Sequence, residues 1–251
     1  MDDAPTLDTM TDPSTLDAHE LARPLRPQGF GRTRPTKIDD AIVEPAWPGV
    51  RVIAAVSDGR ASIFEGGERV ELLGERVELV DDVHAALHQS TGRAIEGAIF
   101  DGYLTKQVLS EGVGVTGWVN EYPTMQGQIT RMFVGGRRSR VDSHDALRER
   151  ELADRAFGED DVVNLVLTDL LWLDGQWLLD VPLLERRRVL ESIIEPSELV
   201  RVGPYVRYPI DSWVGSWRAQ GFRGMTFKAA NSRYRPGEAS QEWTISDLPR
   251  R

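Results

Sequence analysis

The chain has 251 residues, no cysteine and a formal net charge of −10 at pH 7. The absence of cysteine excludes disulfides and thiolate metal sites, and the acidic balance argues against indiscriminate binding of nucleic acid. No apolar run approaches the ~18 residues that a membrane helix needs, and the first residues are acidic, so we expect neither a membrane span nor a signal peptide and predict a cytoplasmic protein.

The N-terminal part differs in composition from the rest. Residues 1–20 are acidic and carry no Lys or Arg, whereas the charge becomes basic from Arg23 to Lys37. Such a segment has too little apolar surface to offset its chain entropy. We therefore predict a disordered acidic, Pro-rich tail and basic linker over residues 1–36, followed by one domain over residues 37–251.

Within the domain, strand and helix patterns are mixed without repeats. Residues 50–56 and 60–65 flank a Ser-Asp-Gly turn and predict a hairpin, and residues 93–105 and 162–173 predict two further strands. Residues 75–90 predict a short strand leading into a helix, and residues 115–135 and 142–157 predict β-structure and a charged helix. Pro182 opens a helical pattern, and residues 221–229 and 242–248 predict closing strands. The irregular alternation favours the α+β class.

Five motifs then occur in a recognisable order. They are "EPAWPGVRV" at 44–52, "IEGAIF" at 95–100, "TDLLWLDG" at 168–175 with "PLLERR" at 182–187, "GFRGMTFK" at 221–228, and "SRYRPG" at 232–237 with "EWTISD" at 242–247. Together they resemble the adenylation (nucleotidyltransferase) domain of ATP-dependent DNA ligases. The resemblance implies an ATP-grasp-like α+β fold with two antiparallel sheets flanked by helices around a groove. Because the sequence ends four residues after Asp247, no OB-fold domain is expected.

The resemblance also implies that the reactive positions are degenerate. The family's nucleophilic lysine corresponds to Ala46 and its neighbouring aspartate to Pro48; an alanine methyl group cannot attack a phosphate. The other altered positions are Ala98 for a glutamate that helps hold metal and ribose, Thr168 for the aromatic that stacks on adenine, Arg223 for an acid, and Ile245 and Asp247 for paired lysines. Arg51, Glu96 and Lys228 are retained as nucleotide or phosphate-binding remnants. ATP and Mg²⁺, expected for the family, are therefore predicted to be lost or weakened as cofactors.

Other candidate residues carry weaker patterns. Lys37 in "KIDD" and Lys106 are the remaining lysines, and neither stands in the family's frame. His84 and His88 have a metal-binding spacing without an evident third ligand. The arginines at 186–188 are expected to face solvent, and Tyr234 is expected to be structural. An arginine cluster beside aromatic residues offers a DNA-binding surface, formed by Arg131, Arg137, Arg138 and Arg140.

These observations leave three hypotheses open. The first is a catalytically inactive accessory in DNA repair or end-joining that binds DNA or a repair protein. The second is a protein-interaction scaffold without DNA contact, which the charge of −10 favours. The third is an active nucleotidyltransferase with displaced residues.

Overall fold

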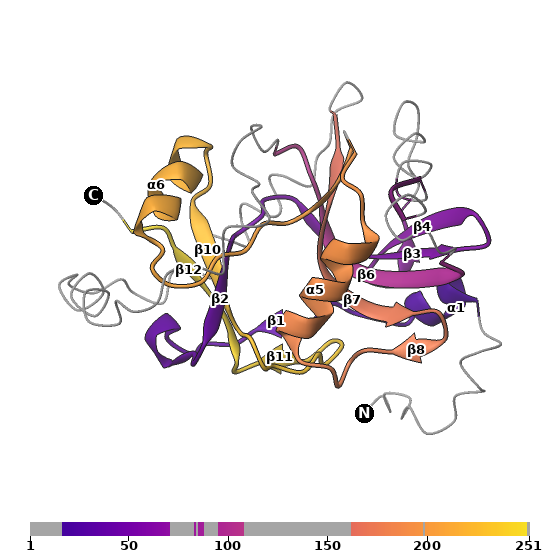
Figure 1. The fold of residues 1–251 in the computed structure, drawn as a ribbon, viewed down its shortest axis with the longest axis horizontal. Coiled ribbons are helices and arrows are strands. Elements are labelled where there is room, and N and C mark those ends of the chain that lie inside the picture. Colours follow the sequence, from indigo (N-terminus) through magenta and orange to yellow (C-terminus); the bar gives the residue numbers. More distant parts are fainter. Residues whose placement is uncertain are drawn as a thin grey trace.

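The computed structural model describes residues 17–70, 83, 85–87, 95–107, 162–197 and 199–249. Figure 1 shows two sheets side by side, with the three-stranded sheet on the left, the larger sheet on the right and α5 (Leu183–Ile193) between them. No helix among the described residues has both the length and the apolar character needed to cross a membrane.

The larger sheet has seven strands and forms the main scaffold. Its path is β5-β4-β3-β6-β7-β8, with β9 paired to β7. The strands are β3 (Val50–Ser57), β4 (Arg60–Glu65), β5 (Glu68–Arg69), β6 (Gly97–Thr105), β7 (Asn164–Leu173), β8 (Gln176–Trp177) and β9 (Val200–Val202). All neighbours are antiparallel except β7 and β9. The predicted hairpin at the Ser-Asp-Gly turn and the predicted strands β6 and β7 are confirmed.

The smaller sheet is antiparallel, in the order β12-β10-β2. It consists of β2 (Ala41–Pro45), β10 (Gly224–Ala229) and β12 (Trp243–Asp247), and α6 (Asp211–Ala219) packs on its outer face through Trp217. The α+β prediction with two largely antiparallel sheets is confirmed, although the sequence reading missed α6 and β2. The prediction that no OB fold follows stays a prediction.

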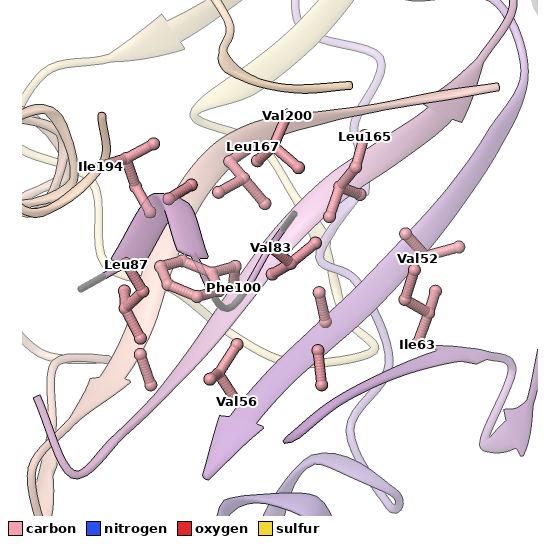
Figure 2. Close-up of a cluster of buried hydrophobic side chains, with 14 of the residues drawn as sticks. Val52, Val56, Ile63, Val83, Leu87, Phe100, Leu165, Leu167, Ile194 and Val200 are labelled. Carbon is pink, nitrogen blue, oxygen red and sulfur yellow. The ribbon is translucent and has the colours of Figure 1, made fainter. Parts of the chain in front are cut away.

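Two hydrophobic layers cover the faces of the seven-stranded sheet. Even-numbered residues of β3 and β6 face one layer, which also contains Val83, Leu87 and, just after α5, Ile194 (Figure 2). Odd-numbered residues such as Ile53 and Ile99 face the other layer, shared with the smaller sheet and α1 (Ala18–Ala22). Strand alternation therefore decides which side chains point toward the smaller sheet.

The predicted linker is part of the fold. After α1, which packs against β3 and β6, the chain forms β1 (Gly29–Phe30), parallel to β11 (Ala239–Ser240), and the 3₁₀ turn η3 (Pro35–Lys37). Ala18, Leu21 and Ala22 are buried. The prediction of an unstructured linker was wrong for residues 17–36, because apolar residues spaced on one short helix turn and a backbone pairing with β11 anchor it. Residues 1–16 lie outside the described part.

Candidate site between the two sheets

The position expected for a nucleophile lies where β2 ends. The Ala46 N–H donates to the Gly224 carbonyl at 2.9 Å, so its methyl group lies beside the start of β10. The following turn needs glycine: Gly49 has φ +112°, and a Cβ there would overlap the Leu104 carbonyl oxygen. The backbone around position 46 thus keeps the turn of the motif, but the Ala46 side chain has no nucleophilic atom.

Lys228, the surviving motif lysine, is enclosed. Its Nζ lies 2.6 Å from a carboxylate oxygen of Glu44, and both side chains are almost completely buried. The ammonium group also lies 4.6 Å from the ring centroid of Trp243, a cation–π distance. The lysine's charge is therefore neutralised within the protein.

Arg51 is likewise engaged on every side. Its guanidinium forms a two-point ion pair with Asp101, at 2.9 and 2.5 Å, and donates to the Gln28 carbonyl. Phe30, Tyr103 and Trp243 surround it with ring centroids 5.3 to 5.9 Å away. Burial opposes the charge, but the Asp101 carboxylate outweighs it and raises the pKa of Arg51 well above its ordinary value.

Tyr234 completes this network. Its hydroxyl donates to Asp101 at 2.7 Å and accepts from the Gln28 N–H at 3.0 Å. Burial, followed by the Asp101 charge, raises the pKa of the Tyr234 hydroxyl well above its ordinary value. The expected structural role of Tyr234 is confirmed.

Helix α5 supplies two further buried charges. Arg186 forms a two-point ion pair with Asp169 at 2.8 and 2.7 Å, and both side chains are fully buried. Arg187 donates to the Thr168 and Gly203 carbonyls and lies 3.7 Å from Glu44. The prediction that these arginines face solvent was wrong for Arg186 and Arg187 and right only for Arg188, because the helix packs this face against β7.

The structure separates Ala98 and Glu96 from the inter-sheet region. Ala98 is fully buried in the layer of even-numbered residues, on the face opposite to Arg51. Glu96 is exposed before β6 begins, where its N–H bonds to Asp174. An acid at position 98 would thus point into the hydrophobic layer. The residues of β6 that share a face with Arg51 include Asp101 and Tyr103.

Thr168 is buried, and its hydroxyl contacts the Asp101 carbonyl at 3.3 Å. Arg223 is exposed and its side chain has no partner among the described residues. On β12, Ile245 and Asp247 pair with Thr226 and Gly224, so they share a face with Lys228. At these three positions the face carries a buried lysine, an isoleucine and an exposed acid.

Comparisons with known proteins agree with this architecture. Residues 134–244 match the sequence model of the ATP dependent DNA ligase domain. DNA ligase 2 of Methanosarcina acetivorans is 27% identical over 202 residues, covering 73% of this chain and 30% of that protein. The DNA ligase of Methanothrix thermoacetophila is 34% identical over 82 residues, which are 32% of this chain and 15% of that protein.

A solved structure shares the fold. The ligase domain of LigD from M. tuberculosis is 20% identical, with a TM-score of 0.55 over 90% of this chain and 60% of that chain. The chain carries the adenylation-domain fold of the ATP-dependent DNA ligase family. It spans less than a third of the curated ligases it matches.

The fold clarifies one motif of the ligase family. The resemblance placed the family pattern Leu-Asp-Gly-Glu at residues 95–98; "FDGY" at 100–103 also contains Asp-Gly, and its Asp101 and Tyr103 lie on the Arg51 face. In that alignment Tyr103, not Ala98, takes the place of the family's glutamate. Strand alternation shows which of the two segments has side chains on the Arg51 face.

The residues present do not fit a magnesium–nucleotide complex of the ligase type. The positions at which the resemblance implies acids hold Pro48, Ala98 and Arg223, none of which offers a carboxylate to Mg²⁺. Among the described residues, no three His, Cys, Asp or Glu side chains cluster in a metal-binding arrangement. Arg131, Arg137, Arg138, Arg140, His84 and His88 lie outside the described residues.

Lys106 lies closer to the degenerate motif than its sequence position indicated. The end of β6 pairs with the start of β3, and the Cα of Thr105 is 3.1 Å from a Cβ built on Gly49. Lys106 follows directly and is exposed. Lys37, in contrast, precedes β2, and the full length of that strand, roughly 16 Å, separates it from Ala46.

Proposed function

We propose that the chain is a catalytically inactive member of the ATP-dependent DNA ligase family that serves as a non-catalytic accessory in DNA repair or end-joining in the cytoplasm. One observation carries the proposal: the nucleophile position is Ala46, and Lys228 is buried against Glu44 at 2.6 Å. Phosphoryl transfer depends on cationic stabilisation and metal binding, and both are removed from this face.

The engaged state of Arg51 supports the same conclusion. Its three hydrogen bonds go to Asp101 and Gln28, and aromatic rings surround the guanidinium, so its charge is already neutralised within the protein. Two of the three predicted nucleotide-binding remnants thus have internal partners, and the third, Glu96, lies elsewhere. A triphosphate would have to displace buried ion pairs, which costs several kcal/mol for each pair.

The test is incubation of the pure chain with Mg²⁺ and α-labelled ATP, beside an active ATP-dependent ligase as positive control. We expect no covalent AMP adduct. An adduct would overturn the proposal and favour the displaced-residue enzyme; its loss in Lys106→Ala or Lys37→Ala would then identify the nucleophile. Lys106 is the stronger candidate for that alternative because it lies beside the Gly49 turn.

The binding role has its own test. A DNA affinity that falls steeply with salt supports the accessory, since neutralised phosphates release counterions. Weakening in an Arg137/Arg138/Arg140 alanine variant would assign the surface predicted from the sequence. No DNA binding at low salt would instead support the protein-interaction scaffold, which is the second proposal because of the charge of −10.

A further inference from the structure

The N-terminal strap, residues 23–37, carries an unusual charge for this chain. It contains four arginines, one lysine and no acid, whereas the whole chain has a net charge of −10. The sequence predicts a basic linker here, within a disordered N-terminal segment. The structure instead holds it against the smaller sheet.

Several backbone contacts fix the strap. The Gly29 N–H donates to the Glu238 carbonyl at 2.8 Å, and the Gly31 N–H donates to the Trp243 carbonyl at 2.9 Å. A Cβ at Gly31 would overlap the Ser240 carbonyl oxygen, so the backbones are in direct contact. Thr33 adds a side-chain hydrogen bond to Gln241 at 3.0 Å.

This anchoring determines where the cations point. Gly31 and Thr33 face the β11–β12 turn. Successive residues of an extended chain point to opposite sides, so Arg32 and Arg34 face outward, and both are exposed. Lys37 is exposed at the end of η3. None of these three side chains forms a hydrogen bond or ion pair with the part of the chain that the structure describes.

Three other exposed arginines are instead paired with acids. Arg188 pairs with Glu185 at 2.6 Å, Arg235 pairs with Asp180 at 3.3 Å, and Arg207 pairs with Asp40. The last pair also neutralises an acid close to the strap in sequence. The strap thus has a backbone fixed by hydrogen bonds and cationic side chains that point outward and are not paired with acids of the described chain. These are the features expected of a site that is preorganised to bind a polyanion.

Resting on the proposed accessory function, we infer that Arg32, Arg34 and Lys37 form a binding surface for the phosphate backbone of a nucleic acid. Two residues of extended chain separate Arg32 from Arg34 by roughly 7 Å, and arginine is well suited to phosphate oxygens. The surface lies beside β12 and the turn that precedes it, at the edge of the smaller sheet.

The experiment measures binding of a fluorescein-labelled DNA duplex and single strand by anisotropy over a range of salt concentrations. The strap variant is Arg32→Ala/Arg34→Ala/Lys37→Ala. The control, Arg60→Ala/Arg69→Ala/Arg188→Ala, removes three exposed cations from elsewhere and has the same net charge. Both keep buried residues intact, and unchanged melting curves confirm folding.

We expect the strap variant to lose roughly tenfold or more in affinity at low salt, with a salt slope reduced by about 2 to 3. The control should lose less than about threefold, and Arg32→Lys/Arg34→Lys should keep the slope because the charges remain. Gly31→Val, which displaces the strap without changing charge, should weaken binding as well.

Equal losses in strap and control variants would overturn the inference, because binding would then follow net charge alone. If only the Arg137/Arg138/Arg140 variant loses binding, the inference fails while the DNA-accessory function stands. If the unmodified chain binds no DNA at low salt, both fail. Competition by polyglutamate as strong as that by DNA would assign the strap to an acidic protein and overturn the nucleic-acid assignment.

Discussion

Glu44 on β2 and Lys228 on the neighbouring strand β10 form a buried ion pair, with 2.6 Å between the carboxylate oxygen and Nζ. The lysine that the family directs at phosphate is here held by the protein's own carboxylate. Arg187 lies 3.7 Å from the other oxygen of Glu44 and links the pair to the seven-stranded sheet through the Thr168 carbonyl. The buried charges at the centre of the fold therefore neutralise one another within the protein.

Breaking this pair should destabilise the protein. Lys228→Met leaves Glu44 buried with only the more distant Arg187, and we expect a loss of about 3–5 kcal/mol in the free energy of unfolding. Urea denaturation measures it. Lys37→Met, at an exposed site, should stay within about 0.5 kcal/mol. An equally small effect for Lys228→Met would show that Lys228 is not held as described.

The α5 arginines allow a matched comparison. Arg186→Leu leaves Asp169 buried and unpaired, with an expected loss of about 3–5 kcal/mol, whereas Arg188→Leu removes an exposed pair worth less than about 1 kcal/mol. Denaturation of both variants tests the assignment of buried and exposed faces. Similar losses would contradict it.

Gly49 is expected to be irreplaceable for steric reasons. Gly49→Ala places a methyl group against the Leu104 carbonyl in a left-handed conformation, and the loss should be about 2–4 kcal/mol. Gly66→Ala is the control, because it also has a positive φ, but a Cβ there meets nothing within 4 Å. A thermal melt of each should rank Gly49→Ala well below Gly66→Ala.

Tyr234 predicts a specific pH dependence. Tyr234→Phe leaves the Gln28 N–H without its acceptor and removes one hydrogen bond from Asp101, which keeps its ion pair with Arg51; the change should cost about 1–3 kcal/mol near neutral pH. Because folding raises the pKa of Tyr234, its contribution is complete below the unfolded pKa of about 10 and is lost as pH rises above it. The stability difference between the two proteins should therefore shrink above pH ~10. A constant difference across that range would contradict the assignment.

Restoring the nucleophile alone should not restore chemistry. Ala46→Lys adds an amine, but Lys228 remains paired with Glu44, and Tyr103 and Arg223 still offer no carboxylate to a metal. We expect no AMP adduct with labelled ATP and Mg²⁺. An adduct in this single variant would show that the remaining site is functional.

The sequence by itself determined the family resemblance, the main strands and the missing nucleophile. The β-rich segments that became β3, β6 and β7 were readable because buried strands need apolar, β-branched residues, and the Asp-Gly turns fixed where two of them ended. The substitution at Ala46 needed no coordinates, since a methyl group has no nucleophilic atom.

Only the tertiary structure decided which charges are buried and on which face each strand residue lies. A one-residue difference reverses the face of a strand, so Ala98 and Tyr103 could not be told apart by composition alone. Arg186 and Arg187 looked like surface residues until Asp169, Glu44 and the Thr168 carbonyl, all distant in sequence, met them. The same holds for the strap, whose order comes from contacts with β11 and β12 more than two hundred residues away, because such contacts leave no local pattern in the sequence.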